Sequence, residues 1–494
     1  MICVSIGRGR HRMMIAEHKH LAENGAALVE LRVDYIRRAV SIQRLLENRA
    51  CPVVIACRRP TDGGKWRGSE KDRVMLLRTA IAEGADYVDI EEDIASQIPR
   101  YGKTKRIISF HDFHETPKNL ETIRDRMLKL DPDIIKIATM ANHATDNTRV
   151  LRLCQEAKVP TTAFCMGEIG MPSRILCRKF GAPFSYGSFH SERLLAPGQL
   201  SFQEMLDKYR FEEINQDTQV YGVIADPVAH SMSPLVHNAN LKHEGLNAIY
   251  LPFRVAREDL YDFIEQCPTL SVKGLSVTIP HKETVLRAIN ALDEDVAGIR
   301  ACNTLVFKDG QVYGYNTDCR AAISSLAQAA GKEVKGKSFT GSTALILGCG
   351  GVAKAMAFGL VSRGAKVLVS GRNTRRTEEF AAEMKCISVD WMARHNVVAN
   401  FVINCTPVGM HPEVNESPFE RDALNSDMIV FDTVYNPEQT LLIKYAREID
   451  CKVVTGIDMF VRQAAMQFQL FTGRKANIDL MRTEVKRAIS AAKY

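Results

Sequence analysis

The stretch TALILGCGGVAKAMAFGLVSRGAKVLVSGR, residues 343–372, decides the fold of the second half of the chain. An apolar strand leads into a glycine-rich turn, a helix that starts with small residues follows, and a second apolar strand comes next. Gly348, Gly350 and Gly351 would let the backbone approach a pyrophosphate at the helix N-terminus, and Ala353 would let the helix pack closely on the strand. Glycine also serves tight turns that bind nothing, but this context favours a dinucleotide-binding Rossmann domain.

The end of the second strand indicates which dinucleotide binds. NAD-binding proteins usually place Asp or Glu there to hold the ribose hydroxyls, whereas the segment SGRNTRR, residues 370–376, contains no acid. Clustered guanidinium groups suit a 2′-phosphate. If the segment were only a solvated helix start, its cations would be poorly placed beside the positive end of the helix dipole. We therefore expect NADP, bound with the help of Arg372, Asn373, Thr374 and Arg376.

Four motifs upstream of this domain, HSMSP, GLSVTIPHK, ACNTL and GYNTD, concentrate polar side chains. Reduction of a ketone by hydride requires a proton at the carbonyl oxygen, and a Lys282–Asp318 pair could supply or relay it. Taken separately, Lys282 could form a surface ion pair and Asp318 could cap a helix. Their concentration favours a substrate site built from the polar residues of the four motifs: Ser231, Ser233, Thr278, Lys282, Asn303, Thr317 and Asp318.

Short apolar runs alternate with amphipathic stretches of helical spacing through the first half of the chain. Eight such runs within about 200 residues favour a closed (β/α)8 TIM barrel over an open sheet, with functional residues at the C-terminal ends of the strands. The eight runs begin at Ile2, Ala27, Pro52, Tyr87, Arg106, Asp133, Thr161 and Ala182.

Lys136 is embedded in the apolar run DIIKIAT, so an inward orientation would take its ammonium out of water. Desolvated lysines lose their proton more readily and attack carbonyls; the alternative is a side chain that extends to solvent at the strand end. His111 follows the preceding strand, and we expect it to act as acid and base, with Glu91 orienting its ring and favouring its charged form. Such a set suits proton abstraction beside a ketone, followed by loss of a β-hydroxyl.

Composition excludes several classes of protein. The chain has 494 residues, which suits two or three domains. Its net charge is +7, but no basic run with interleaved aromatic residues supports nucleic-acid binding. The 13 cysteines show no CxxC or metal-ligand spacing, which indicates a reduced intracellular protein without a metal site. There is no long apolar segment, so we expect no membrane span and a cytoplasmic, or already processed, protein.

The motifs of the first half resemble those of the type I 3-dehydroquinate dehydratases over residues 1–210. ELRVD, SFHDF followed by TP, DIIKIA, FCMG with SR soon after, and APGQ carry the resemblance. It implies Lys136 as the imine-forming lysine, His111 as acid and base, and Glu91 as its partner. Leu195 departs from the serine usual before APGQ, which puts one substrate hydrogen bond in doubt. The resemblance also implies substrate contacts from Glu30, Arg32, Arg58, Met166, Arg174 and Gln199.

The second half is similar to shikimate dehydrogenase over residues 220–490, through the four upstream motifs and NCTPVGM, VYNPEQT and GIDMFVRQA. The resemblance implies Lys282 and Asp318 as the catalytic pair and places Tyr435 near the substrate carboxylate. Because Ser233 and Thr278 are both present, shikimate is favoured over quinate. Shikimate would be held by Ser231, Ser233, Thr278, Asn303, Thr317 and Gln463.

We therefore expect a dehydratase barrel at 1–215, a substrate-binding domain at 219–320 with a C-terminal return at 457–494, and a Rossmann NADP-binding domain at 321–456. The polar linker between the halves is too short for free tethering. The ligands would be 3-dehydroquinate, 3-dehydroshikimate and shikimate, since the product of the first reaction is the substrate of the second.

Two alternatives stay open at this point. One is a quinate-directed catabolic pair of activities, and the other is a non-catalytic sensor of quinate or shikimate. A sensor would need none of the four catalytic residues Lys136, His111, Lys282 and Asp318. The sequence gives no oligomeric state.

Overall fold

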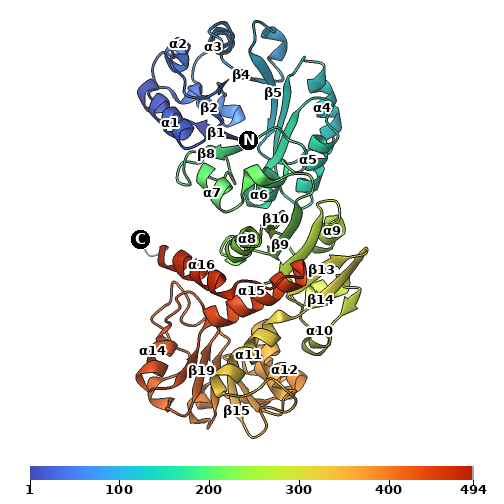
Figure 1. Ribbon diagram of the computed structural model, residues 1–494, viewed down its shortest axis with the longest axis vertical. Helices are drawn as coiled ribbons and strands as arrows, with labels where there is room; N and C mark the ends of the chain where they lie inside the picture. Colours follow the sequence, from blue (N-terminus) through green and yellow to red (C-terminus); the bar gives the residue numbers. More distant parts are fainter. Residues whose placement is uncertain (492–494) are drawn as a thin grey trace. The chain divides into compact units, whose positions relative to one another are not determined.

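The computed structural model describes residues 1–491 and divides into two compact units (Figure 1). The first unit consists of Met1–Val220, Asp226–His230 and Asn247–Ser271. The second consists of Tyr221–Ala225, Ser231–Leu246 and the chain from Val272 onward.

The first unit contains an eight-stranded parallel sheet of order β7-β6-β5-β4-β3-β2-β1-β8. β8, the last strand of this unit's parallel sheet in the chain, pairs with β1, the first. The sheet therefore curls back on itself into a nearly closed barrel. Thr162 on β7 donates a 2.9 Å hydrogen bond to the carbonyl of Phe184, just before β8. The predicted barrel is confirmed, with strands β1 (Ile2–Ile6), β2 (Leu28–Arg32), β3 (Val53–Ala56), β4 (Tyr87–Glu91), β5 (Lys105–Asp112), β6 (Ile134–Met140), β7 (Thr161–Met166) and β8 (Ser185–Ser188).

Helices cover the outside of the barrel, with α1 to α3 on one flank and α4 and α5 on another (Figure 1). Only a 3-10 turn, Ala95–Gln97, follows β4. The helices are α1 (His11–Glu23), α2 (Ile42–Leu46), α3 (Glu70–Ala82), α4 (Leu120–Leu128), α5 (Asp146–Gln155), α6 (Gly167–Leu176) and α7 (Phe202–Asp207). The segment Asn247–Ser271 adds β10 (Ala248–Arg254) and α9 (Leu260–Gln266) to this unit.

The interior of the barrel is layered along its strands. An apolar cluster that includes Leu28, Ile107 and Ile134 fills the end where the strands begin. Residues two apart on a strand share a face. Glu30 and Lys136 therefore lie on the same inward faces as Leu28 and Ile134, one step nearer the C-terminal ends. The strand period thus places polar side chains above an apolar layer, at the end of the barrel where active sites form.

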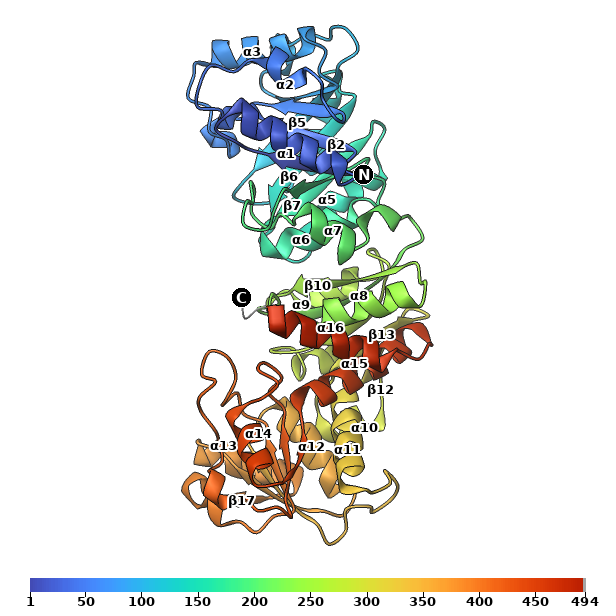
Figure 2. The same cartoon turned by 60° about the vertical axis from the view of Figure 1, so that its left-hand side comes forward.

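The second unit contributes β9, β11, β13, β14 and β12, in that order, to a mixed sheet in which β13 runs antiparallel to both its neighbours. The C-terminal helices return to this part of the chain. In Figure 2, α16 lies beside α8, and Asn477 donates its backbone N–H to Asn240 of α8 at 2.8 Å. The elements are β9 (Gln219–Ala225), α8 (Ser233–His243), β11 (Val272–Val277), β12 (Ala291–Leu292), α10 (Glu294–Ile299), β13 (Thr304–Lys308), β14 (Gln311–Tyr315), α15 (Gly456–Thr472) and α16 (Ile478–Ala491).

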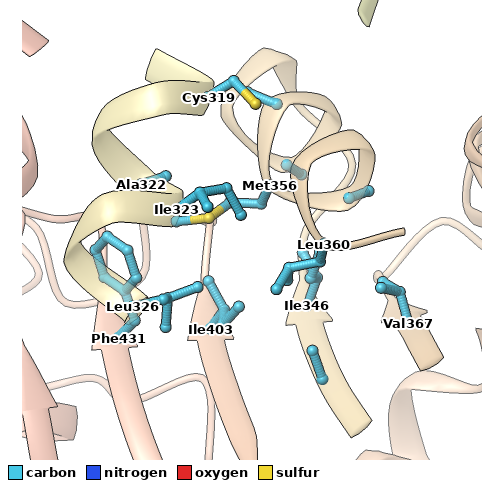
Figure 3. Packing of buried hydrophobic residues seen from close by; sticks show 14 of the residues in the cluster. Cys319, Ala322, Ile323, Leu326, Ile346, Met356, Leu360, Val367, Ile403 and Phe431 are labelled. Atoms are coloured by element: carbon cyan, nitrogen blue, oxygen red, sulfur yellow. The ribbon is translucent and has the colours of Figure 1, made fainter. Parts of the chain in front are cut away.

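The predicted Rossmann domain is also confirmed, as a parallel sheet of order β17-β16-β15-β18-β19-β20 with helices on its faces. Figure 3 shows Ile323 and Leu326 of α11 packing with Met356 and Leu360 of α12 over the sheet. The elements are α11 (Thr317–Ala330), β15 (Thr343–Leu347), α12 (Gly351–Val361), β16 (Lys366–Ser370), α13 (Thr374–Met384), β17 (Ile387–Val389), β18 (Phe401–Asn404), β19 (Ile429–Asp432), α14 (Leu441–Glu448) and β20 (Lys452–Val454).

Candidate active sites

A polar pocket lies at the C-terminal ends of the barrel strands. Lys136 and His111 line it, whereas Glu91 does not. All six of the expected substrate contacts also line it: Glu30, Arg32, Arg58, Met166, Arg174 and Gln199.

Lys136 points into the barrel and is 4% exposed, which rules out the alternative in which it extends to solvent. Its Nζ donates to Asp89 Oδ2 at 3.0 Å and to Glu30 Oε1 at 3.4 Å. The same nitrogen lies 3.8 Å from the centre of the Tyr186 ring. Two carboxylates and an aromatic face therefore hold the Lys136 ammonium group out of water, at the wall of the pocket.

His111 does not contact Glu91, contrary to our expectation. Glu91 instead accepts from Arg58 at 3.3 Å and from Arg73 at 2.6 Å, and Arg58 Nη1 lies 3.2 Å from His111 Nδ1. A guanidinium only donates, so Nδ1 accepts and the neutral ring carries its proton on Nε2.

The charge state of His111 is also opposite to the one we expected. Burial, followed by the positive charges of Arg58 and Lys136, holds the pKa of His111 well below its usual range. The neutral form is favoured, because a buried imidazolium beside two cations is costly. Glu91 acts on the ring only through Arg58.

The three arginines among the expected substrate contacts differ in their partners. Arg32 forms two 2.9 Å hydrogen bonds with Asp34, and Arg58 contacts Asp89 at 2.5 Å. Arg174 has no carboxylate partner within residues 1–491, although it is only 1% exposed. Burial lowers its pKa to about 10. A buried guanidinium without a counter-ion is the arginine best suited to an anionic ligand.

Arg174 lies in α6, which begins directly after Met166. The APGQ segment packs against this helix: Arg174 donates to the carbonyl of Pro197 at 3.0 Å. Gly198 has a φ of +68°, and a Cβ there would lie 2.2 Å from the carbonyl oxygen of Gly167. Leu195 lines the pocket and donates its N–H to Gln199 Oε1 at 3.0 Å, which leaves the amide nitrogen of Gln199 free to donate to a ligand.

In the second unit, Lys282 Nζ lies 2.5 Å from Asp318 Oδ2, and both side chains are largely buried. Lys282 follows β11, and Asp318 is in the first turn of α11. The cap of α11 is Asn316, whose Oδ1 accepts from Cys319, so capping does not explain Asp318. The predicted pair is therefore formed, by residues from two separate segments.

Asn303 and Thr317 form a hydrogen-bonded unit next to Asp318. The Asn303 amide donates to Thr317 Oγ1 at 2.9 Å and accepts from its N–H at 2.8 Å. Gln467 of α15 donates to the carbonyl of Asn303 at 3.0 Å. Gln463, which we expected to contact substrate, is buried and donates to the carbonyl of Phe460. Gln467, one helical turn further on, was not found from the sequence.

The remaining expected substrate contacts form local hydrogen bonds or stack on a neighbouring ring. Ser231 Oγ accepts the N–H of Ser233 at the start of α8. Thr278 directly follows β11, and its carbonyl accepts from His281 at 2.8 Å. Tyr435 stacks on Phe460 of α15, with ring centres 5.3 Å apart. Within residues 1–491, no hydrogen bond, ion pair or ring contact joins these residues to the Lys282–Asp318 pair.

The glycine-rich turn has the geometry that a pyrophosphate needs. Gly348 has a φ of +105°, and a Cβ there would lie 3.0 Å from the carbonyl oxygen of Cys405. A Cβ on Gly350 would meet nothing within 4 Å, and one on Gly351 would lie 3.6 Å from Lys282 Cδ. The first turn of α12 has no acidic residue and no side-chain cap. The turn is therefore open for a dinucleotide and lies beside Lys282; Ala353 is buried under it.

The residues that follow β16 differ in their contacts and exposure. Asn373 caps α13 by accepting from the N–H of Arg376 at 3.0 Å. The Arg376 side chain reaches back to the carbonyl of Cys349 in the glycine-rich turn, at 3.3 Å. Arg372 is exposed and has no carboxylate partner in the part of the chain that the structure describes. Thr374 is the first residue of α13.

Residues 1–491 contain neither a metal-binding cluster nor a membrane-spanning helix. No group of three or more His, Cys, Asp or Glu side chains is placed to hold a metal ion. None of the helices is both long and apolar enough to cross a membrane.

Comparison with known families matches each part of the chain in turn. The model for type I 3-dehydroquinase matches residues 2–216, and the shikimate dehydrogenase substrate-binding domain matches 223–305. A coenzyme F420-dependent NADP oxidoreductase model matches 343–435, and the shikimate 5′-dehydrogenase C-terminal domain matches 456–486. A chloroplastic bifunctional 3-dehydroquinate dehydratase/shikimate dehydrogenase from Arabidopsis thaliana is 35% identical over 97% of this chain and 83% of its own length.

The chain belongs to the bifunctional 3-dehydroquinate dehydratase/shikimate dehydrogenase family.

The dehydrogenase half also matches relatives that lack the dehydratase half. The NADP⁺ shikimate dehydrogenase of Caldanaerobacter subterraneus subsp. tengcongensis is 36% identical over 56% of this chain and 99% of its own length. The crystal structure of a shikimate dehydrogenase in complex with NADP⁺ is 33% identical, with a TM-score of 0.52 over 56% of this chain and 97% of that one.

Two further residues of the barrel, Asp89 and Tyr186, contact Lys136, and the sequence alone assigned no role to either. Asp89 accepts from Lys136, Arg58 and Ser109, and burial opposed by Arg58 and Lys136 leaves its pKa below the usual range. Tyr186 forms the aromatic face beneath Lys136. Asp89 could have been found, because it lies two residues before Glu91 on the same inward face of β4.

Proposed function

We propose that this chain catalyses two consecutive reactions of the shikimate pathway. Its barrel dehydrates 3-dehydroquinate to 3-dehydroshikimate, and its second half reduces that product to shikimate with NADPH. The observation that carries the proposal is the pairing of two separate lysine sites: Lys136 buried between Asp89 and Glu30, and Lys282 against Asp318.

In the barrel, Lys136 attacks the substrate ketone, and water leaves as the imine forms. A proton is then removed from the adjacent carbon, and the protonated imine nitrogen accepts the electron pair. The β-hydroxyl leaves as water after accepting the Nε2 proton of His111, the ring nitrogen not occupied by Arg58. The proton removed from the adjacent carbon replaces it on Nε2, so the ring is neutral again at the end of the step. Hydrolysis of the product imine releases 3-dehydroshikimate and restores the Lys136 amine. Arg174, the buried cation without a carboxylate, binds the substrate carboxylate.

Before it can attack, Lys136 must lose a proton. Asp89 and Glu30 stabilise its ammonium form, so we infer that an entering substrate displaces Lys136 from one of these carboxylates. Glu91 acts as a positioning residue: it holds Arg58, and Arg58 holds the His111 ring.

In the second half, Lys282 donates a proton to the carbonyl oxygen of 3-dehydroshikimate, and Asp318 keeps the ammonium in place. When bound, NADPH supplies the hydride to the carbonyl carbon. The glycine-rich turn from Gly348 to Gly351 would hold its pyrophosphate, and Arg372 with Arg376 would hold its 2′-phosphate. We also infer that the serines, Thr278, Asn303 and Thr317 bind the substrate hydroxyls and that Gln463 and Tyr435 line the same site.

Matched single substitutions test this division. With 3-dehydroquinate and NADPH, Lys136→Ala should form no 3-dehydroshikimate, yet it should still oxidise NADPH when 3-dehydroshikimate is added. Lys282→Ala should accumulate 3-dehydroshikimate and form no shikimate. If either substitution abolished both activities in a folded protein, the assignment of one lysine to each reaction would be wrong.

We further propose that the dehydratase domain ends near residue 215, which the family match to 2–216 supports. The remaining domains would be 219–320 with 457–494, and 321–456. We also propose a cytoplasmic location, because all 13 cysteines are free, as expected in a reducing compartment. Fractionation of the source cells would test it.

A further inference from the structure

A second cavity, of about 1040 Å³, lies in the barrel unit outside the catalytic pocket. Three segments form it, at residues 7–13 after β1, 34–37 after β2, and 65–68 after β3. None of its lining residues lines the catalytic pocket. We call it the arginine groove, because its lining includes Arg8, Arg10, Arg37, Lys65 and Arg67.

Positive charge in the arginine groove is largely uncompensated. Arg8 pairs with Glu17, but the other four cations have no carboxylate partner within residues 1–491. The one carboxylate in the lining, Asp34, is buried and binds Arg32 at 2.9 Å. Several like charges around one cavity repel one another, and a bound anion would remove that repulsion.

The backbone adds to the attraction for anions. α1 begins at His11, at the edge of the groove, and continues for 13 residues. Its first turn has no acidic residue, and Arg10 provides no side-chain cap. The positive end of the helix dipole therefore adds to the charges of Arg10 and its neighbours.

Two aromatic side chains give the groove a flat apolar wall. Lys65 Nζ lies 4.4 Å above the centre of the Tyr35 ring. Trp66 donates its indole N–H to the carbonyl of Ser69 at 3.1 Å. A Cβ on Gly68 would lie 2.5 Å from Trp66 Cζ2, so the indole packs directly on the backbone there. A fixed indole beside cations can stack on a planar ring.

From this combination we propose that the arginine groove binds a nucleoside polyphosphate, at a site separate from both active sites. The unpaired cations and the start of α1 would hold the phosphates, and Trp66 would stack on the base. The proposed nucleotide site in the arginine groove does not depend on the activity of either half of the chain.

The alternative is that the groove only attracts anionic substrate towards the barrel mouth. Attraction of that kind raises association rates and falls with salt, but it creates no saturable site. Saturable binding of a nucleotide therefore separates the two possibilities.

The test uses the full chain with saturating NADP⁺ and no shikimate, so that the Rossmann domain is occupied and no turnover occurs. A Trp391→Phe background leaves Trp66 as the only indole, since the chain has 2 tryptophans. ATP is then titrated by calorimetry and by indole fluorescence, with inorganic triphosphate and adenosine as separate probes. We expect ATP to bind saturably and to quench Trp66, triphosphate to compete with it, and adenosine to bind far more weakly.

Arg37→Ala and Arg67→Ala should each weaken ATP binding about tenfold, the usual effect of losing one charge-assisted contact. Arg38→Ala is the matched control: it removes the same charge from an exposed neighbour that does not line the groove, and should change affinity little. An absence of saturable ATP binding, or equal losses for Arg37 and Arg38, would overturn the site. Equal affinity for ATP and triphosphate without quenching would overturn the nucleoside assignment.

Discussion

At the scale of single residues, the barrel site depends on one lysine whose surroundings are apolar on one side and acidic on the other. Lys136 is 4% exposed and contacts Asp89 and Glu30. We predict that borohydride added with 3-dehydroquinate attaches the ligand covalently to Lys136, because reduction traps the imine. Peptide mapping by mass spectrometry locates the adduct. Lys136→Ala is the control, and an adduct on another lysine would contradict the mechanism.

The neutral state of His111 leads to a prediction about pH. A pKa held well below the ordinary value, which is about 6.5 for histidine, keeps the ring neutral as the pH falls through that value. The acid limb of the dehydratase kcat/KM profile that belongs to His111 should therefore lie below pH 6.5. A profile measured on the wild type and on His111→Asn checks this. If the acid limb lay at or above pH 6.5 and disappeared in His111→Asn, Glu91 rather than Arg58 would determine the pKa of His111.

Arg372 is the residue whose removal should change cofactor preference most. It is exposed and free of carboxylate partners in residues 1–491. We predict that Arg372→Ala weakens NADPH binding by about 1.5–3 kcal/mol, the usual cost of a lost charge-assisted contact, and affects NADH much less. Arg375→Ala is a matched control, because Arg375 pairs with Glu379 along α13. Equal losses for both cofactors would mean that Arg372 contacts a part that they share.

At the scale of elements, a turn and the helix after it act together. In the turn between β15 and α12, Gly348 has a positive φ that favours glycine, whereas a Cβ on Gly350 would enter open space. We predict that Gly350→Ala preserves thermal stability but weakens NADPH binding, because its methyl group enters open space where a pyrophosphate would approach.

Gly348→Ala provides the contrast. A φ of +105° is unfavourable for alanine, and the new methyl would lie 3.0 Å from a backbone carbonyl. It should lower the melting temperature as well as cofactor affinity, whether or not nucleotide is present. Calorimetric melting without nucleotide distinguishes the two variants. A large loss of stability in Gly350→Ala would show that the space at that glycine is needed by the protein itself.

At the scale of the whole molecule, each half contains its own proposed catalytic residues and its own sheets. We predict that fragments ending near Asn215 and beginning near Thr218 are each soluble and active. The first should dehydrate 3-dehydroquinate without nucleotide, and the second should reduce 3-dehydroshikimate with NADPH. Activity assays of each fragment alone and of the mixture check this. A folded fragment that became active only in the mixture would show that the halves share a site.

The sequence alone predicted the architecture and singled out the residues to which we assign the two reactions. Continuous apolar runs predicted all eight barrel strands, because parallel strands buried on both faces must be apolar along their length. The same reasoning placed Lys136 inside the barrel. The glycine-rich turn predicted the Rossmann domain, because a positive φ and a close backbone approach leave a local record in the sequence.

Only the tertiary structure decided which groups pair. It inserted Arg58 between Glu91 and His111 and left Arg174, among the three expected arginines, without a carboxylate. It also brought Gln467 to Asn303 and assembled the arginine groove from three separate segments. Hydrogen bonds and ion pairs depend on distances of a few tenths of an ångström between residues far apart in the chain. No local periodicity records those distances, whereas strand burial and turn geometry are properties of consecutive residues.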